Sequence, residues 1–192
     1  MQDSKHLAVY RVMEPEKELL NNIKEGDRTA MQELYSRYVG YAMAVALRYV
    51  PDRDDAQDVI HDSFVKILTS INRFTYRGEG SLKAWILRIV ANEAISFIKQ
   101  KGKFSFVDEM PDLESQDEPA VEKVPPQVLN QMIGELPDGY RVVLNMYVFD
   151  QKSHKEIAKE LGIKESTSAS QYLRAKKLLA KKINDYLNNN EI

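Results

Sequence analysis

The stretch SHKEIAKELGIKESTSASQYLRAKK, residues 153–177, decides the fold of the C-terminal part of this sequence. Ser153, followed three residues later by Glu156, has the spacing of a capping box, which starts a helix. Gly162 can adopt the left-handed conformation that ends a helix and turns the chain. The stretch therefore predicts two short helices joined by a tight turn, which is a helix-turn-helix over residues 154–173.

The second of these helices has the side chains of a DNA reader. Residues 164–182 contain six basic residues and one acid. In a helix-turn-helix the N-terminal residues of the second helix meet base edges, while the flanks meet phosphate. Glutamine suits adenine, and arginine or lysine suits guanine or phosphate. The predicted contacts are Ser166, Thr167, Ala169, Ser170, Gln171, Arg174 and Lys177. A solvated basic face on a packed helix is the alternative interpretation.

Composition places the chain among ordered, soluble proteins. Its 192 residues suffice for one or two domains, and 43% of them are hydrophobic. The net charge of -2 means that DNA binding would depend on how charge is distributed. There is no cysteine, so no disulfide or thiolate metal site is expected. We see no signal peptide and no apolar run long enough to insert into a membrane, and we expect a cytoplasmic location.

Apolar residues recur at three- and four-residue steps along most of the chain, and no strand alternation is visible. We therefore expect an all-α fold made of two small helical domains. Residues 108–122 interrupt the pattern with seven acids and no base, which is typical of a flexible acidic linker. The predicted boundaries are residues 25–103 for the first domain, 104–126 for the linker and 127–187 for the second domain.

The first domain carries an acidic face. Asp55, Asp58 and Asp62 follow one another at spacings of three and four residues, so they share one side of a helix, with Gln57 beside them. Three interpretations are open at this point. The face could dock a partner, the carboxylates could hold a divalent metal, or they could be a solvated helix start favoured by the helix dipole.

A basic and polar face follows. Residues 73–103 contain seven basic residues and two acids, in a helix that we expect Ser81 to cap. One side of this helix presents cations for phosphate together with an amide for a base, as melted DNA requires. These residues are Arg88, Asn92, Ser96 and Lys99.

Two parts of the chain resemble the extracytoplasmic-function sigma factors of RNA polymerase. DAQDVIHDSFVKIL, residues 55–68, and FTYRGEGSLKAWILRIVANEAISFIKQKGK, residues 74–103, resemble region 2 of that family. LPDGYRVVLNMYVFDQKSHKEIAKELGIKESTSASQYLRAKKLL, residues 136–179, resembles region 4. The resemblance covers roughly residues 25–183. It implies an alternative sigma factor that binds core RNA polymerase and directs promoter-specific initiation, without catalytic activity or cofactor of its own.

The resemblance also implies partners and roles. The acidic face would dock on the clamp helices of the largest polymerase subunit, and region 4 would meet the flap and read the -35 element. A loop at residues 77–82 would capture a flipped-out base, and the linker would enter polymerase channels. An anti-sigma factor is expected. The residues that would contact the -10 element are Arg77, Arg88, Asn92, Ser96 and Lys99.

The sequence departs from the family pattern in the second helix of the helix-turn-helix. Ser168 stands where the family has an apolar anchor, and Gln171 stands where arginine is common. We expect His154 to be an exposed helix residue. Two other functions compete with the sigma factor: a stand-alone helix-turn-helix regulator with a helical sensing domain, and a metal-dependent helical enzyme that uses the three aspartates.

Overall fold

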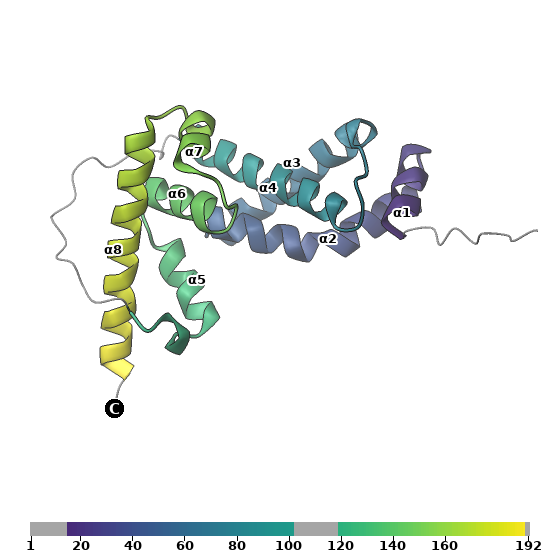
Figure 1. Cartoon of the computed structure of the whole chain (residues 1–192). Helices are drawn as coiled ribbons and strands as arrows, with labels where there is room; N and C mark the ends of the chain where they lie inside the picture. Colours follow the sequence, from purple (N-terminus) through teal and green to yellow (C-terminus); the bar gives the residue numbers. More distant parts are fainter. Residues whose placement is uncertain (1–14, 102–118, 191–192) are drawn as a thin grey trace, which may run out of the picture.

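The computed structural model describes residues 15–101 and 119–190, and within these ranges every regular element is a helix. This confirms the all-α fold. The helices form two groups, with α1 to α4 in one and α5 to α8 in the other (Figure 1). Most of the linker expected at residues 104–126 lies outside the described residues, which resume at Pro119.

The first group comprises α1 (Pro15–Lys24), α2 (Arg28–Tyr49), α3 (Arg53–Ser70), the short 3-10 helix η1 (Ile71–Arg73) and α4 (Ser81–Gln100). The side chain of Asp27 caps α2, and that of Asp52 caps α3, because each accepts hydrogen bonds from backbone amides of the first turn. The expected cap Ser81 is instead the first residue of α4. Gly80 precedes it with a φ of 79°, and the Ser81 hydroxyl donates to the carbonyl of Gly78.

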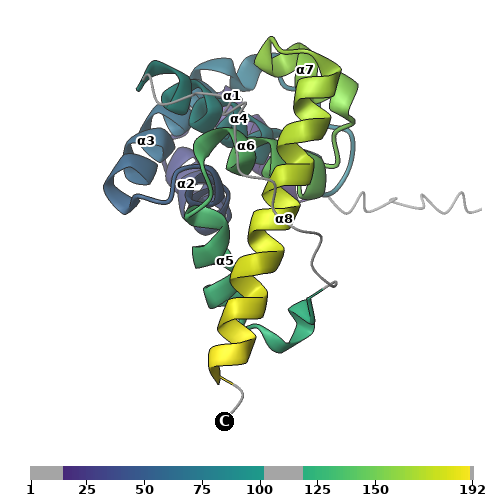
Figure 2. The ribbon, with the colours of Figure 1, turned by 90° about the vertical axis from the view of Figure 1, so that its left-hand side faces the viewer.

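The second group comprises the 3-10 helix η2 (Val121–Lys123), α5 (Pro126–Gly134), α6 (Asp138–Val148), α7 (His154–Leu161) and α8 (Glu165–Asn190). Pro126 begins α5 at a position where proline's missing amide hydrogen costs nothing. Helix α8 is the longest element and runs past both α6 and α5, as the view along α2 shows (Figure 2).

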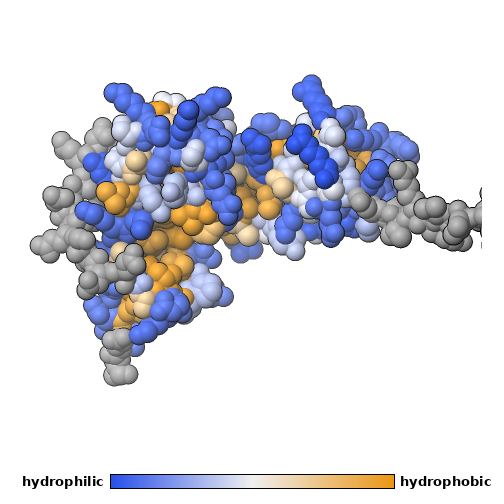
Figure 3. All heavy atoms as spheres, in the orientation of Figure 1, coloured by the Kyte–Doolittle hydropathy of each residue, from blue (hydrophilic) through white to orange (hydrophobic). Residues whose placement is uncertain are grey.

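The two groups share the largest of the three buried hydrophobic clusters that the described residues form. Val142, Val143 and Met146 of α6 belong to the same buried cluster as the inner residues of α2, α3 and α4. Hydrophobic surface gathers around this junction and on the side of α5 and α8, whereas the upper and outer surfaces in this view are hydrophilic (Figure 3). The fold therefore holds the face of α4 and the helix-turn-helix close to one another.

Within residues 15–101 and 119–190, no helix combines the length and the hydrophobicity that crossing a bilayer requires.

Candidate nucleic-acid and polymerase interfaces

The helix-turn-helix forms as its sequence predicts. The Glu156 amide donates to the Ser153 hydroxyl, and the Glu156 carboxylate accepts from the Ser153 amide at 2.9 Å, which completes the capping box. The Ser153 hydroxyl also donates to this carboxylate at 2.7 Å, and this bond, together with the one from the amide, lowers the pKa of Glu156. Gly162 ends α7 with a φ of 73°, and its amide donates to the carbonyl of Ala158 at 2.9 Å. Helix α8 begins at Glu165.

Most of the predicted -35 contacts lie on the accessible side of α8. Ser166 and Ala169 are exposed, and four more are half-buried: Thr167, Ser170, Arg174 and Lys177. Gln171 is different, because its side chain has no exposed surface. It lies on the inward line of the helix between Ser168 and Ala175, both of which are fully buried. In this arrangement the Gln171 amide is not available to a base, contrary to the expectation from sequence.

Ser168 is a polar residue in the core of the helix-turn-helix, and it has a partner there. The Nδ1 atom of His154 lies 3.0 Å from the Ser168 hydroxyl. The His154 ring stacks on Tyr147, with ring centroids 4.6 Å apart, so it is half-buried and not exposed as expected. A polar contact between α7 and Ser168 of α8 therefore takes the place of the apolar anchor that the family pattern has at this position.

The acidic face lies along the outer side of α3. Gln57, Asp58 and Asp62 are exposed, whereas Asp55 is half-buried and accepts a hydrogen bond from the Lys101 ammonium group at 2.5 Å. Three acids on one accessible face suit a basic partner surface. Among residues 15–101 and 119–190, no group of three or more histidine or acidic side chains is arranged to hold a metal ion.

An apolar groove borders this acidic face, and sequence reasoning missed it. Its lining includes Met43, Ile60, Phe64 and Leu68, in a hollow of about 480 Å³ between α2 and α3. Two large apolar side chains on the groove are themselves exposed, Tyr35 by 47% and Val65 by 52%. The Tyr35 ring lies at the surface against Phe64.

The polar face of α4 is present as predicted from its spacing. Arg88, Asn92, Ser96 and Lys99 are all exposed on α4, and Arg77 is exposed in the loop before it. The second group of helices approaches this face at two places. The Lys99 ammonium group donates to the carbonyl of Glu160 in α7 at 3.3 Å. Arg88 lines a cavity of about 500 Å³ that α4 shares with the start of α7.

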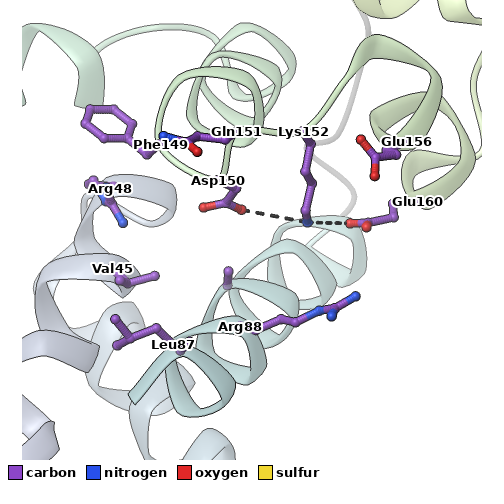
Figure 4. A pocket seen from close by; sticks show the side chains of 12 residues that line it. Val45, Arg48, Leu87, Arg88, Phe149, Asp150, Gln151, Lys152, Glu156 and Glu160 are labelled. Atoms are coloured by element: carbon purple, nitrogen blue, oxygen red, sulfur yellow. Dashed lines mark hydrogen bonds and ion pairs between the residues drawn. The ribbon is translucent and has the colours of Figure 1, made fainter. Parts of the chain in front are cut away.

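That cavity lies between the two groups of helices (Figure 4). Lys152 crosses it and pairs with Asp150 and with Glu160, while Arg88 extends from α4 on the opposite side. Phe149 forms its upper wall, and its ring contacts the Arg48 guanidinium group at 4.5 Å.

Buried polar bonds join the two groups beside the cavity. The Arg141 guanidinium group donates to the carbonyl of Tyr49 at 2.9 Å, and the Asn145 amide donates to the carbonyl of Arg48 at 2.9 Å. These bonds satisfy carbonyls at the C-terminal end of α2, where the helix has no amide donor of its own to offer them. The Tyr49 hydroxyl donates to Asp150 at 2.8 Å, and burial raises the pKa of Tyr49 far above its ordinary range, with Asp150 adding to the effect.

The arrangement of these helices matches known domains. The profile described as Sigma-70 region 2 matches residues 34–104, and the profile described as Sigma-70, region 4 matches residues 127–179. Together they account for more than half of the chain and for both groups of helices. The chain therefore belongs to the sigma-70 family of transcription initiation factors.

Similar proteins refine this assignment. The RNA polymerase sigma-H factor of Pseudomonas aeruginosa is 24% identical over 91% of this chain and 96% of its own length. The ECF RNA polymerase sigma-E factor of Haemophilus influenzae is 24% identical over 86% of this chain and 93% of its own. The sigma factor RpoE of Bartonella quintana, solved with the anti-sigma factor NepR, covers 78% of this chain and 94% of its own at 19% identity, with a TM-score of 0.49.

The chain is an alternative sigma factor of the extracytoplasmic-function type, which directs transcription initiation. Helices α5 to α8 contain its region 4, which includes the helix-turn-helix of α7 and α8, and α2 to α4 contain its region 2. This confirms the resemblance drawn from the sequence. A stand-alone regulator would leave the region 2 match unexplained.

Proposed function

We propose that the chain acts in the cytoplasm and binds core RNA polymerase through the outer face of α3. The observation that carries this proposal is that one short chain presents three separate faces of different chemistry. The acidic face of Asp55, Asp58 and Asp62, with Gln57, would dock on the clamp helices of the largest subunit. The adjoining apolar groove adds hydrophobic area to a contact that charge alone would leave weak.

Region 2 contacts the -10 element through the exposed side of α4. Unpaired DNA offers phosphates and unstacked bases, and this face offers cations together with the Asn92 amide. The contacting residues that we propose are Arg77, Arg88, Asn92, Ser96 and Lys99. Lys99 and Arg88 also face the second group of helices, so this group moves aside when DNA binds.

Region 4 reads the -35 element as duplex through α8. Its base contacts come from the accessible hydroxyl, methyl and guanidinium groups of Ser166, Thr167, Ala169, Ser170 and Arg174, and Lys177 meets phosphate. Gln171 contributes by supporting the helix from its buried side. The -35 sequence is therefore read without the amide contact that the sequence had suggested.

The proposal also covers the rest of the chain. Functional boundaries fall at residues 25–103, 104–126 and 127–187, and the acidic linker enters basic polymerase channels. Region 4 also meets the flap. An anti-sigma factor binds where the two groups of helices meet, because Val148 and Phe149 are exposed by 46% and 43% at that edge. The chain has no catalytic activity of its own.

Run-off transcription tests the proposal. Purified protein, core RNA polymerase and a fragmented genomic library from the host are combined, and the transcripts are sequenced. We expect discrete start sites that core alone does not give, with two shared upstream elements. An active core and a folded protein that together yield no new start sites would contradict the proposed function.

Asp58→Arg tests the docking face within the same assay. Asp58 is exposed and capping is left to Asp52, so the variant should fold normally and yet lose core binding and new transcripts. Glu18→Arg is the matched control, since it makes the same charge change at an exposed position on α1. Core binding by both variants at wild-type affinity would remove α3 as the docking face.

A further inference from the structure

Helix α1 lies outside the part of the chain that the region 2 profile matches, and it packs beside the loop that leads into α4 (Figure 1). Leu19, Leu20 and Ile23 fix α1 to the core, since each has at most 4% of its surface exposed. Its polar side chains are therefore held at defined positions relative to the loop of residues 74–80.

Two polar side chains of α1 bind the two ends of this loop. The Lys24 ammonium group donates to the carbonyl of Phe74 at 3.2 Å, where the loop begins. The Oε2 atom of Glu16 accepts from the amide of Gly80 at 3.1 Å, where the loop ends and α4 starts. Gly80 has no side chain with which to cap α4, and its own amide is bound by a carboxylate from another helix, which lies beside the positive end of the helix dipole.

Glu16 is itself held in place. Its Oε1 atom accepts from the Tyr38 hydroxyl at 2.9 Å. Burial raises the pKa of Tyr38 to about 12, and the hydrogen bond to Glu16 adds to the increase, so the hydroxyl remains a donor at neutral pH. Both carboxylate oxygens of Glu16 are therefore used, one to fix the side chain and one to fix the loop.

The C-terminal part of this loop contains two glycines with positive φ angles. Gly78 and Gly80 have φ values of 112° and 79°, and Arg77 is exposed between the fixed ends. The Ser81 hydroxyl accepts from the Arg77 amide at 3.2 Å and donates to Gly78. Phe74 and Tyr76 pack against the core, so the glycines give conformational freedom chiefly to residues 77–80.

We propose that Glu16 is a positioning residue, through which α1 holds the loop of residues 74–80 ready to capture an unpaired base of the -10 element. This rests on the proposed role of region 2 at that element. Ordering the loop beforehand removes an entropic cost that binding would otherwise carry. Glu16 touches no DNA itself, and its effect on capture passes through Gly80.

The test uses holoenzyme assembled from the full chain and core polymerase, on a promoter found by run-off transcription. 2-Aminopurine is placed at each position of the -10 element in turn, because its fluorescence rises when the base leaves the stack. We expect wild type to give a rise at one position. Glu16→Ala should weaken capture there about tenfold, as for the loss of one charge-assisted hydrogen bond. Glu16→Gln, which keeps one acceptor, should fall in between.

Three controls separate positioning from damage. Glu18→Ala removes an exposed carboxylate two residues further along the same helix and should leave capture unchanged. Core affinity and -35 duplex affinity should be the same for all variants. If Glu16→Ala fails to fold, Lys24→Met releases the other end of the loop and should weaken capture by a similar factor.

The outcomes distinguish this inference from the proposed function. If wild type captures a base at one position and Glu16→Ala and Lys24→Met capture it equally well, the positioning role is wrong. The proposed function is then unaffected. A wild-type holoenzyme that initiates transcription but captures no base at any position removes the -10 role of the loop, and the positioning role with it.

Discussion

At the scale of single residues, burial decides which side chains of α8 can read DNA. Ser168, Gln171 and Ala175 follow one another at spacings of three and four, and all three have no exposed surface. The sequence already placed Ser168 at an inward position, so the helical period placed Gln171 there as well. Because glutamine is polar, Gln171 was nevertheless expected to lie on the exposed side of the helix. The partner of Ser168, His154, could not be found from sequence because it lies across the turn.

This burial predicts opposite results for two neighbouring residues. Gln171→Ala should lower the free energy of unfolding by about 1–3 kcal/mol, because it leaves a cavity, and the preference among -35 sequences should not change. Arg174→Ala should instead weaken binding to the cognate -35 duplex by about 1–3 kcal/mol if Arg174 reads a base. Denaturation and fluorescence anisotropy measure the two quantities.

If Gln171→Ala keeps its stability but changes the preference among -35 sequences, Gln171 turns outward when DNA binds. A loss of affinity in Arg174→Ala that is equal for all sequences, with a smaller salt dependence, would assign Arg174 to phosphate. Lys181→Ala is a suitable control, because Lys181 is exposed on the same helix well beyond the turn.

At the scale of elements, the helices that sequence predicts best are those with a cap of their own. The capping box of Ser153 and Glu156, and the caps Asp27 and Asp52, form as local sequence dictates. The start of α4 was misassigned because the N-cap is Gly80, whose amide is bound by Glu16, 64 residues away. A contact from a distant residue leaves no local signal.

The capping box predicts a dependence on pH. Ser153→Ala should lower the free energy of unfolding by about 1 kcal/mol at neutral pH. The pKa of Glu156 is lowered from its ordinary value of 4.5 in the folded protein, so its contribution is present above that value and is lost as the pH falls through the lowered pKa. The difference between variant and wild type should therefore shrink in acid.

Urea denaturation of both proteins at pH 7 and at several values below pH 4.5 measures this difference. Ser36→Ala is the control, because Ser36 is exposed in the middle of α2 and caps no helix. A cost of Ser153→Ala that is the same at every pH would show that the carboxylate of Glu156 contributes nothing to the cap.

At the scale of the whole molecule, the sequence predicted two groups of helices but not the contact between them. Arg141 and Asn145 lie four residues apart on α6 and look like one polar stripe of an amphipathic helix. Both are buried, because they donate to main-chain carbonyls at the end of α2. Main-chain acceptors exist in every sequence, so the pattern of side chains does not indicate such an interface.

The contact has a consequence for promoter binding. Elements at -10 and -35 are about 25 base pairs apart, which is roughly 85 Å along the duplex at ~3.4 Å per base pair. In the structure, Lys99 on the face proposed for the -10 element lies 3.3 Å from Glu160 in the helix-turn-helix. The two groups must therefore separate before both elements are bound. The 25 residues between Gln100 and Pro126 could span a comparable distance when extended.

Asn145→Asp should favour this separation. The substitution keeps the shape of the side chain but places a carboxylate against the carbonyls of Arg48 and Arg141, in a site with no exposed surface. An unpaired charge buried there is unfavourable, and the cost is relieved when the two groups move apart. We expect a larger distance between the groups, together with faster assembly on core polymerase.

The absence of cysteine makes the distance measurable, because cysteines introduced at Ser36 and Lys181 can be labelled specifically for energy transfer. Asn130→Asp is the matched control, since it makes the same change at an exposed position on α5. Lower transfer efficiency in Asn145→Asp alone, with helix content preserved, is the expected result. Equal efficiencies in all three proteins would mean that the polar bonds at the end of α2 do not hold the groups together. The hydrophobic contacts of Val142, Val143 and Met146 would then be sufficient.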